Sequence, residues 1–166
     1  MTTSLGELSA SPAVSVILPV LNEEPHLEES VSAILSQDYL GVFEVILALG
    51  PSRDRTDEIA RALAAGDSRV KLVANPTGKT AAGLNLAIAT SNSPIIVRVD
   101  GHAKIPNNYL SLAVEILRKT GAVNVGGVMA AEGVTNFEIA VARAMRSALG
   151  VGSSRFHTGG EAGEVD

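Results

Sequence analysis

Cysteine is absent from the 166-residue chain. Its absence excludes disulfide bridges, thiolate zinc sites and cysteine nucleophiles, and it is compatible with a reducing compartment, so we expect a cytoplasmic location. Because the formal net charge is −5, no basic surface stripe is expected, and nucleic acid is excluded as the expected partner. A small anionic ligand would therefore have to be bound by a few local donors or by a metal ion.

Long hydrophobic runs are missing as well. No stretch approaches the roughly 18 to 20 apolar residues that a membrane-spanning helix requires. Residues 1–12 are small and polar and lack the basic and apolar blocks of a secretory signal, so we expect a flexible leader. The chain as a whole, with 46% hydrophobic and 19% charged residues, has the composition of one globular domain with a substantial core.

The sequence does contain a regular alternation of short β-branched runs and helical patterns. Nearly continuous apolar runs predict buried parallel strands over residues 14–18, 43–49, 70–73, 95–99 and 123–129. Apolar residues at helical spacing lie between each pair of runs. This order predicts a Rossmann-like α/β fold, a mainly parallel sheet flanked by helices, with ligands bound by the loops after the strands.

The pattern changes beyond residue 130. We expect residues 13–130 to form the α/β domain and residues 131–166 to begin a second, acceptor-side region. A helical pattern over residues 136–149 precedes a glycine-rich tail. Arg143 and Arg146 in that pattern leave two hypotheses: peripheral association of the helix with a membrane surface, or an ordinary amphipathic helix, which the pattern favours.

The most informative polar cluster follows the fourth run, where Asp100 ends the strand and His102 comes two residues later. In an extended or tightly turned backbone these side chains can converge on one ion, and an oxygen with a nitrogen ligand suits Mn²⁺ or Mg²⁺. Such a divalent cation would offset the charge of a leaving nucleoside diphosphate. The alternative is a turn begun by Asp100 with a solvated His102, and spacing alone favours it.

The loop after the first run contains Pro19, Asn22 and Glu23 but none of the glycines that a dinucleotide-binding fold places there. A nicotinamide or flavin site is therefore disfavoured, and so is a nucleotidyltransferase, which would ordinarily have a glycine-rich loop at this point. Asn22 and Glu23 could bond ribose hydroxyls or a base. Equally, they suit the N-terminus of a helix.

A third polar segment surrounds Lys79. Gly78, Lys79 and Thr80 open a predicted helix as in a P-loop, but the upstream glycine of that motif is lacking, so a P-loop is rejected. Lys79 beside a helix N-terminus stays a candidate phosphate ligand, against the alternative of a surface lysine.

Taken in order, these segments resemble the family 2 glycosyltransferases, which have the A-type nucleotide-diphospho-sugar transferase fold. Residues 16–24 resemble the family's first strand and its Pro-x-x-Asn-Glu turn, Asn75 and Gly78 resemble its Asn-x-x-Gly, and Asp100 matches the first acid of its Asp-x-Asp. Three further segments look most like the succinoglycan-biosynthesis type, which builds bacterial exopolysaccharide: residues 50–56, 100–103 and 155–160.

The resemblance implies transfer of a sugar from a nucleotide-diphospho-sugar donor to a hydroxyl of a glycan or lipid-linked acceptor in polysaccharide biosynthesis. It implies a metal-dependent reaction with inversion, and peripheral membrane association of the full-length enzyme as a further hypothesis. The implied metal ligands are Asp100 and His102. The implied nucleotide-sugar site consists of Pro19, Asn22, Glu23, Lys79 and Asp100.

Two departures limit the resemblance. Leu49 and Gly50 stand where the family commonly has an acidic pair that reads the nucleobase, so a uridine preference does not carry over. The family's catalytic base, an acid in a later Glu-Asp element, has no match in the chain, and we expect it beyond Asp166, in a longer enzyme. The alternative function is a non-catalytic module that binds a sugar nucleotide without turning it over.

Overall fold

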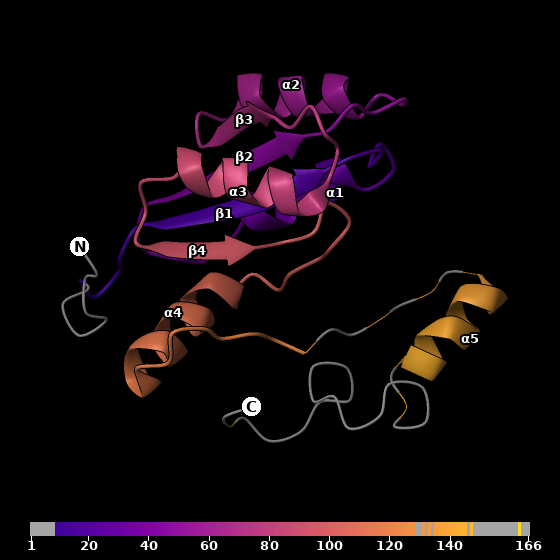
Figure 1. Cartoon of the computed structure of the whole chain (residues 1–166). Coiled ribbons are helices and arrows are strands. Elements are labelled where there is room, and N and C mark those ends of the chain that lie inside the picture. Colours follow the sequence, from indigo (N-terminus) through magenta and orange to yellow (C-terminus); the bar gives the residue numbers. More distant parts are fainter. Residues whose placement is uncertain are drawn as a thin grey trace. The chain divides into compact units, whose positions relative to one another are not determined.

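The computed structural model describes residues 9–128, 131, 133, 135–145, 147 and 163. The chain divides into two compact units, Met1–Val123 and Asn124–Asp166. In the described part of the first unit, strands alternate with helices along the chain (Figure 1). These elements are β1 (Val14–Val20), α1 (Leu27–Leu35), β2 (Phe43–Leu49), α2 (Thr56–Gly66), β3 (Val70–Ala74), α3 (Thr80–Thr90), β4 (Ile95–Arg98) and α4 (Tyr109–Thr120). The second unit contains α5 (Asn136–Met145).

The four strands form one parallel sheet in the order β3-β2-β1-β4. β1 and β2 lie in the middle with a neighbour on each side, and nearly all of their residues are buried. Parallel strands in this position are covered on both faces, which is why their sequences are almost continuously apolar. The parallel sheet flanked by helices confirms the predicted fold class.

The order of the connections distributes the helices over both faces of the sheet. From β1 the chain moves to β2 and β3 on one side, and then it returns to β4 on the other side of β1. Because βαβ crossovers are right-handed, α1 and α2 lie on one face and α3 lies on the other. α3 crosses in front of the sheet in Figure 1. Its Ala87 packs there against Ile17, Ile46 and Ala48 in a buried core cluster.

The reversal between β1 and β4 creates a switch point in the sheet. Pairing of β1 with β4 ends at Ile17 opposite Arg98, whereas pairing of β1 with β2 continues to Val20. Pro19 has no backbone N–H, and it lies where β1 has a neighbour on only one side. The strand order reverses here, and open α/β sheets bind their ligands at such points.

The fifth predicted strand, over residues 123–129, is wrong. The chain forms no strand over residues 123–128, where Val123 and Val128 are exposed, and Met129 lies outside the described residues. Gly126 and Gly127 interrupt the apolar run. Glycine in the interior of a strand weakens it, because it loses more backbone entropy on folding and offers no side chain to pack.

The predicted leader and the predicted last helix are only partly described. Residues 1–8 lie outside the described residues, whereas the carbonyl of Pro12 accepts a hydrogen bond of 2.5 Å from the Tyr39 hydroxyl. The helix predicted over residues 136–149 is present as α5, and residues 146, 148 and 149 are not described. Its location at a membrane surface stays a prediction. Among the described residues, no helix is long and apolar enough to cross a membrane.

Candidate functional site

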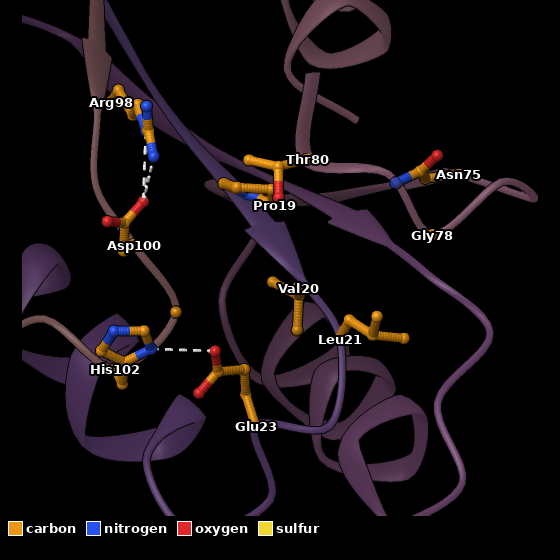
Figure 2. Close-up of a pocket in the computed structure, with 11 residues that line it drawn as sticks. Pro19, Val20, Leu21, Glu23, Asn75, Gly78, Thr80, Arg98, Asp100 and His102 are labelled. Carbon is orange, nitrogen blue, oxygen red and sulfur yellow. Dashed lines mark hydrogen bonds and ion pairs between the residues drawn. The ribbon is translucent and has the colours of Figure 1, made fainter. Parts of the chain in front are cut away.

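An open pocket of about 320 Å³ lies at the switch point, beyond the carboxyl ends of β1 and β4 (Figure 2). Three segments far apart in sequence form its walls: the end of β1 with its loop, the start of α3 with the preceding loop, and the end of β4 with its loop. The lining residues are Pro19, Val20, Leu21, Glu23, Asn75, Gly78, Thr80, Arg98, Asp100, Gly101 and His102.

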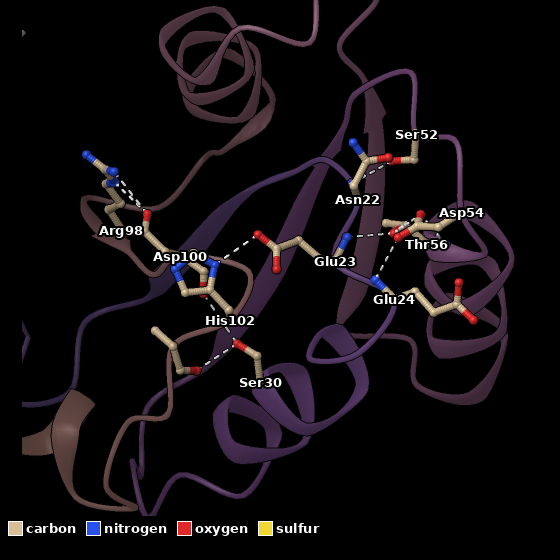
Figure 3. A network of polar contacts seen from close by, with 11 residues as sticks. Asn22, Glu23, Glu24, Ser30, Ser52, Asp54, Thr56, Arg98, Asp100 and His102 are labelled. Carbon is tan, nitrogen blue, oxygen red and sulfur yellow. Dashed lines mark hydrogen bonds and ion pairs between the residues drawn. The ribbon is translucent and has the colours of Figure 1, made fainter. Parts of the chain in front are cut away.

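The loop after β1 is held by the loop after β2 (Figure 3). The backbone N–H groups of Asn22 and Glu23 donate to the hydroxyls of Ser52 and Thr56, at 3.1 and 2.8 Å. The side-chain oxygen of Asn22 accepts the N–H of Arg53 at 2.8 Å. Asn22 also has a φ of +55°, a left-handed conformation that asparagine tolerates better than most residues. Asn22 therefore shapes this loop, and its predicted bond to a nucleoside stays a prediction.

Asp54 completes this junction between the two loops. Its carboxylate accepts the Thr56 hydroxyl at 2.5 Å, and it also accepts the backbone N–H groups of Thr56 and Glu24, each at 3.1 Å. The Thr56 hydroxyl above all, and these N–H groups, lower the pKa of Asp54 below its ordinary 3.8, against an opposing effect of desolvation. Each of these bonds is stronger when the carboxylate is ionised, so Asp54 joins the loops best in its charged form.

We expect the Asp54 junction to be lost in acid. Because its pKa is lowered by folding, its contribution to the free energy of unfolding is fully present above pH 3.8 and disappears as the pH falls toward the folded-state pKa. Asp54→Asn should therefore be less stable than the wild type at neutral pH, and the difference between the two proteins should shrink as the pH falls below 3.8. Urea unfolding at several pH values measures this. A difference that does not change with pH would contradict the prediction.

The loop between β3 and α3 is a tight turn around Asn75. The buried side chain of Asn75 accepts the Thr77 hydroxyl at 2.9 Å and donates to the carbonyl of Lys79 at 3.1 Å. Gly78 adopts a φ of +65°, which glycine reaches without strain. Lys79 is exposed at the N-cap of α3, next to Thr80 in the pocket wall. The N-terminus of α3 thus faces the pocket, where the helix dipole favours an anion.

The loop after β4 carries the residues predicted to bind metal. Nδ1 of His102 lies 2.9 Å from Oε1 of Glu23, so the loops on either side of the switch point meet there (Figures 2 and 3). A Cβ atom on the buried Gly101 would lie 2.9 Å from Cγ of Glu23. Only glycine therefore leaves room for the Glu23 side chain. The Ser30 hydroxyl of α1 anchors the same loop by donating to the carbonyl of Ala103 at 2.9 Å.

Arg98 is a pocket residue to which the sequence analysis gave no role. Its Nε and Nη2 atoms donate to Oδ1 of Asp100 at 3.1 and 2.9 Å. The signal was available in the sequence, because residues two apart in an extended chain point to the same side. Among the described residues, no group of three or more histidine and acidic side chains is arranged to hold a metal ion. Asp100 and His102 would thus need ligands from a bound molecule to complete a metal site.

The chain is similar in sequence to proteins of polysaccharide biosynthesis and to glycosyltransferases. The model of glycosyl transferase family 2 matches residues 15–161. The chain is 35% identical to the succinoglycan biosynthesis protein ExoA of Rhizobium meliloti (strain 1021) over 158 residues, which are 94% of this chain and 48% of that protein. It is 42% identical to the putative glycosyltransferase EpsE of Bacillus subtilis (strain 168) over 57% of this chain and 34% of that protein. The chain thus spans about half or less of the length of these relatives.

Solved structures agree with the fold. The mannosyltransferase PcManGT from Pyrobaculum calidifontis, in complex with GDP-Man and Mn²⁺, has a TM-score of 0.59 and 31% identity over 67% of this chain and 35% of its own. Glucosyl-3-phosphoglycerate synthase from Mycobacterium tuberculosis, in complex with Mn²⁺, UDP and glucosyl-3-phosphoglycerate, has a TM-score of 0.52 and 25% identity over 69% of this chain and 44% of its own. Both structures therefore share the α/β fold of this chain.

Proposed function

This chain belongs to glycosyl transferase family 2, and from that premise we propose that its pocket binds the nucleotide-diphospho-sugar donor of a glycosyltransferase. The observation that carries the proposal is the meeting of Glu23 and His102 across the switch point, with Asp100 in the same pocket wall. Two loops more than seventy residues apart join here by a direct bond. A pocket at the carboxyl edge of a parallel sheet, with polar side chains from several loops, is the arrangement in which such folds bind nucleotides.

The residues of the pocket fit a divalent cation. Asp100 supplies a carboxylate that already attracts the guanidinium of Arg98, and the oxygen and nitrogen donors of Asp100 and His102 suit Mn²⁺. When bound, such an ion would neutralise charge on the diphosphate of the donor. Two protein ligands are few for a metal site, but Mg²⁺ and similar ions in phosphate-transfer sites are commonly held by one or two side chains and by the phosphates themselves. We therefore propose that metal and nucleotide bind together.

Glu23 has a distinct part in this proposal. If Nδ1 of His102 donates its proton to the Glu23 carboxylate, Nε2 carries the free lone pair and is available to a metal ion. Glu23 then acts on the metal through His102, in addition to its predicted position beside the nucleoside. Asn22, Pro19 and Lys79 keep their predicted places around the donor, with Lys79 near the diphosphate.

For the complete enzyme we propose direct displacement at the anomeric carbon with inversion. An acceptor hydroxyl loses its proton to a base, its oxygen forms the new bond to the sugar, and the bond to the nucleoside diphosphate breaks. The part of this chain is to bind and orient the donor for that attack. The base is predicted beyond Asp166. The similarity to a succinoglycan biosynthesis protein supports an acceptor in exopolysaccharide synthesis, a glycan or a lipid-linked sugar.

The proposal is tested by calorimetric titration of the chain with UDP, GDP, ADP and CDP and with their sugar derivatives, each with and without Mn²⁺. Several bases are needed because Leu49 and Gly50 supply no carboxylate to the turn that reads the base in related proteins. We expect binding of one base, strengthened by the metal. No binding of any nucleotide by a folded chain would refute the proposal. Binding without turnover in the presence of acceptor would favour the non-catalytic module.

A further inference from the structure

Arg98 is the cationic side chain of the pocket wall that the proposed donor site leaves without a role. It is the last residue of β4, and 55% of its side chain is exposed. In Figure 2 its guanidinium points along the wall toward Asp100, to which it donates two hydrogen bonds. Both bonds end on the same oxygen, Oδ1. Two of the five N–H donors of the guanidinium are used in this pair.

The pair between Arg98 and Asp100 is easily separated. With 55% and 47% of the two side chains exposed, water solvates both charges after separation, and such exposed pairs contribute little to folding stability. The pair is therefore poorly explained as a structural device. Its location is informative instead, because it neutralises the carboxylate that is predicted to bind the metal.

We propose that Arg98 is a diphosphate-binding residue that exchanges Asp100 for the donor's diphosphate when a divalent cation takes its place on the carboxylate. A cation held by the Asp100 carboxylate would compete with the guanidinium of Arg98 for that carboxylate, and the two positive charges would repel each other. The released planar guanidinium matches phosphate oxygens with two parallel N–H bonds. Thr80 at the N-terminus of α3 lines the same pocket, which gives the diphosphate a second favourable neighbour. The inference rests on the proposed function, because the diphosphate is that of the proposed donor.

This exchange predicts opposite effects of one substitution. Arg98→Met removes the charge and keeps the length of the side chain. Binding of Mn²⁺ without nucleotide should become tighter, by up to about fivefold, because the competitor for Asp100 is gone. Binding of the nucleoside diphosphate at saturating Mn²⁺ should become weaker by about tenfold or more, because a charged hydrogen-bond donor is lost. The affinities of Arg98→Lys should lie between those of the wild type and of Arg98→Met, since lysine keeps the positive charge but lacks the two parallel N–H donors of the guanidinium.

The experiment uses the full chain, electron paramagnetic resonance for Mn²⁺ and calorimetry for UDP, GDP, ADP and CDP and for the corresponding nucleosides. The loss in Arg98→Met should be confined to ligands with a diphosphate, and nucleoside binding should not change. The matched control is Arg61→Met, because Arg61 forms a similarly exposed pair with Asp57 on α2 at 3.3 Å, outside the pocket. That variant should bind metal and nucleotide as the wild type does.

Two results would overturn the inference while leaving the proposed function intact. If Arg98→Met weakens metal and nucleotide binding alike, Arg98 only positions Asp100. If it changes neither, Arg98 has no part in the site. A wild-type chain that binds none of the four nucleoside diphosphates at any Mn²⁺ concentration would refute the proposed function itself, and this inference with it.

Discussion

Asp100→Ala is expected to abolish the gain in nucleotide affinity that Mn²⁺ gives to the wild-type chain. Asp100 is the only carboxylate that the proposal gives to the metal, and its removal would leave the ion one neutral protein ligand, His102. Removing the hydrogen-bond partner of a metal ligand commonly lowers metal affinity by ten- to hundredfold. Removing the ligand itself should therefore lower metal affinity by at least about a hundredfold. Calorimetry with and without Mn²⁺, using the nucleoside diphosphate that the wild type prefers, measures the effect.

For Asp100→Ala we also expect a specific effect on nucleotide affinity in the absence of metal. Asp100→Ala deprives Arg98 of its partner, and the free guanidinium should then keep or raise the metal-independent affinity for the diphosphate. A general loss of fold would instead lower both values. Glu58→Ala is a suitable control, because Glu58 is an exposed carboxylate that pairs with Arg55 on the surface. If Asp100→Ala keeps the full response to Mn²⁺, the metal assignment to Asp100 is wrong.

Glu23→Ala is expected to lower the affinity for Mn²⁺ by about ten- to hundredfold, the usual effect of removing the hydrogen-bond partner of a ligating histidine. The carboxylate of Glu23 lies 2.9 Å from Nδ1 of His102. Without it, the tautomer with the proton on Nε2 becomes populated, and that nitrogen can no longer bind the metal. Glu23→Gln should recover part of the affinity, because its amide oxygen can still accept the Nδ1 proton.

The tautomer of His102 gives a readout that a merely structural role of Glu23 would not change. Nitrogen-15 spectra of the imidazole should indicate a protonated Nδ1 in the wild type and a larger share of protonated Nε2 in Glu23→Ala, with His102→Gln as the assignment control. Gly101→Ala should produce the same shift, because the added Cβ would lie 2.9 Å from Cγ of Glu23 and push this side chain from its place. A wild-type ring protonated on Nε2 would disprove the arrangement.

The fold class could be predicted from the sequence because one physical pattern repeats along the chain. Strands covered on both faces must be apolar throughout, and helices covered on one face must be apolar at every third or fourth position. Residues 43–49 were predicted as a strand with the bounds that β2 has in the structure. The strand predicted over residues 123–129 by the same rule is wrong. The hydrophobic pattern does not take into account that a pair of glycines offers no side chains to pack.

The candidate site was predictable in part. The sequence analysis chose Pro19, Glu23, Asp100 and His102 as site residues because they follow predicted strands. All four line the pocket. The partners of these residues were not predictable, since the bond of Glu23 to His102 spans 79 positions in sequence. Lys79 is exposed beside the pocket's Thr80, and its role near the diphosphate stays a prediction.

By itself, the sequence determined the alternation of strands and helices, the loops that hold the polar residues, and membership of the family, because each of these depends on residues close together in the chain or on their order. Only the tertiary structure decided which distant side chains meet: that Glu23 bonds to His102, that Gly101 makes room for Glu23, and that the loop after β2 holds Asn22. These contacts arise from the position of β1 between β2 and β4 in the sheet. A hydrophobic pattern specifies that a strand is buried, but its neighbours follow from how the whole sheet packs.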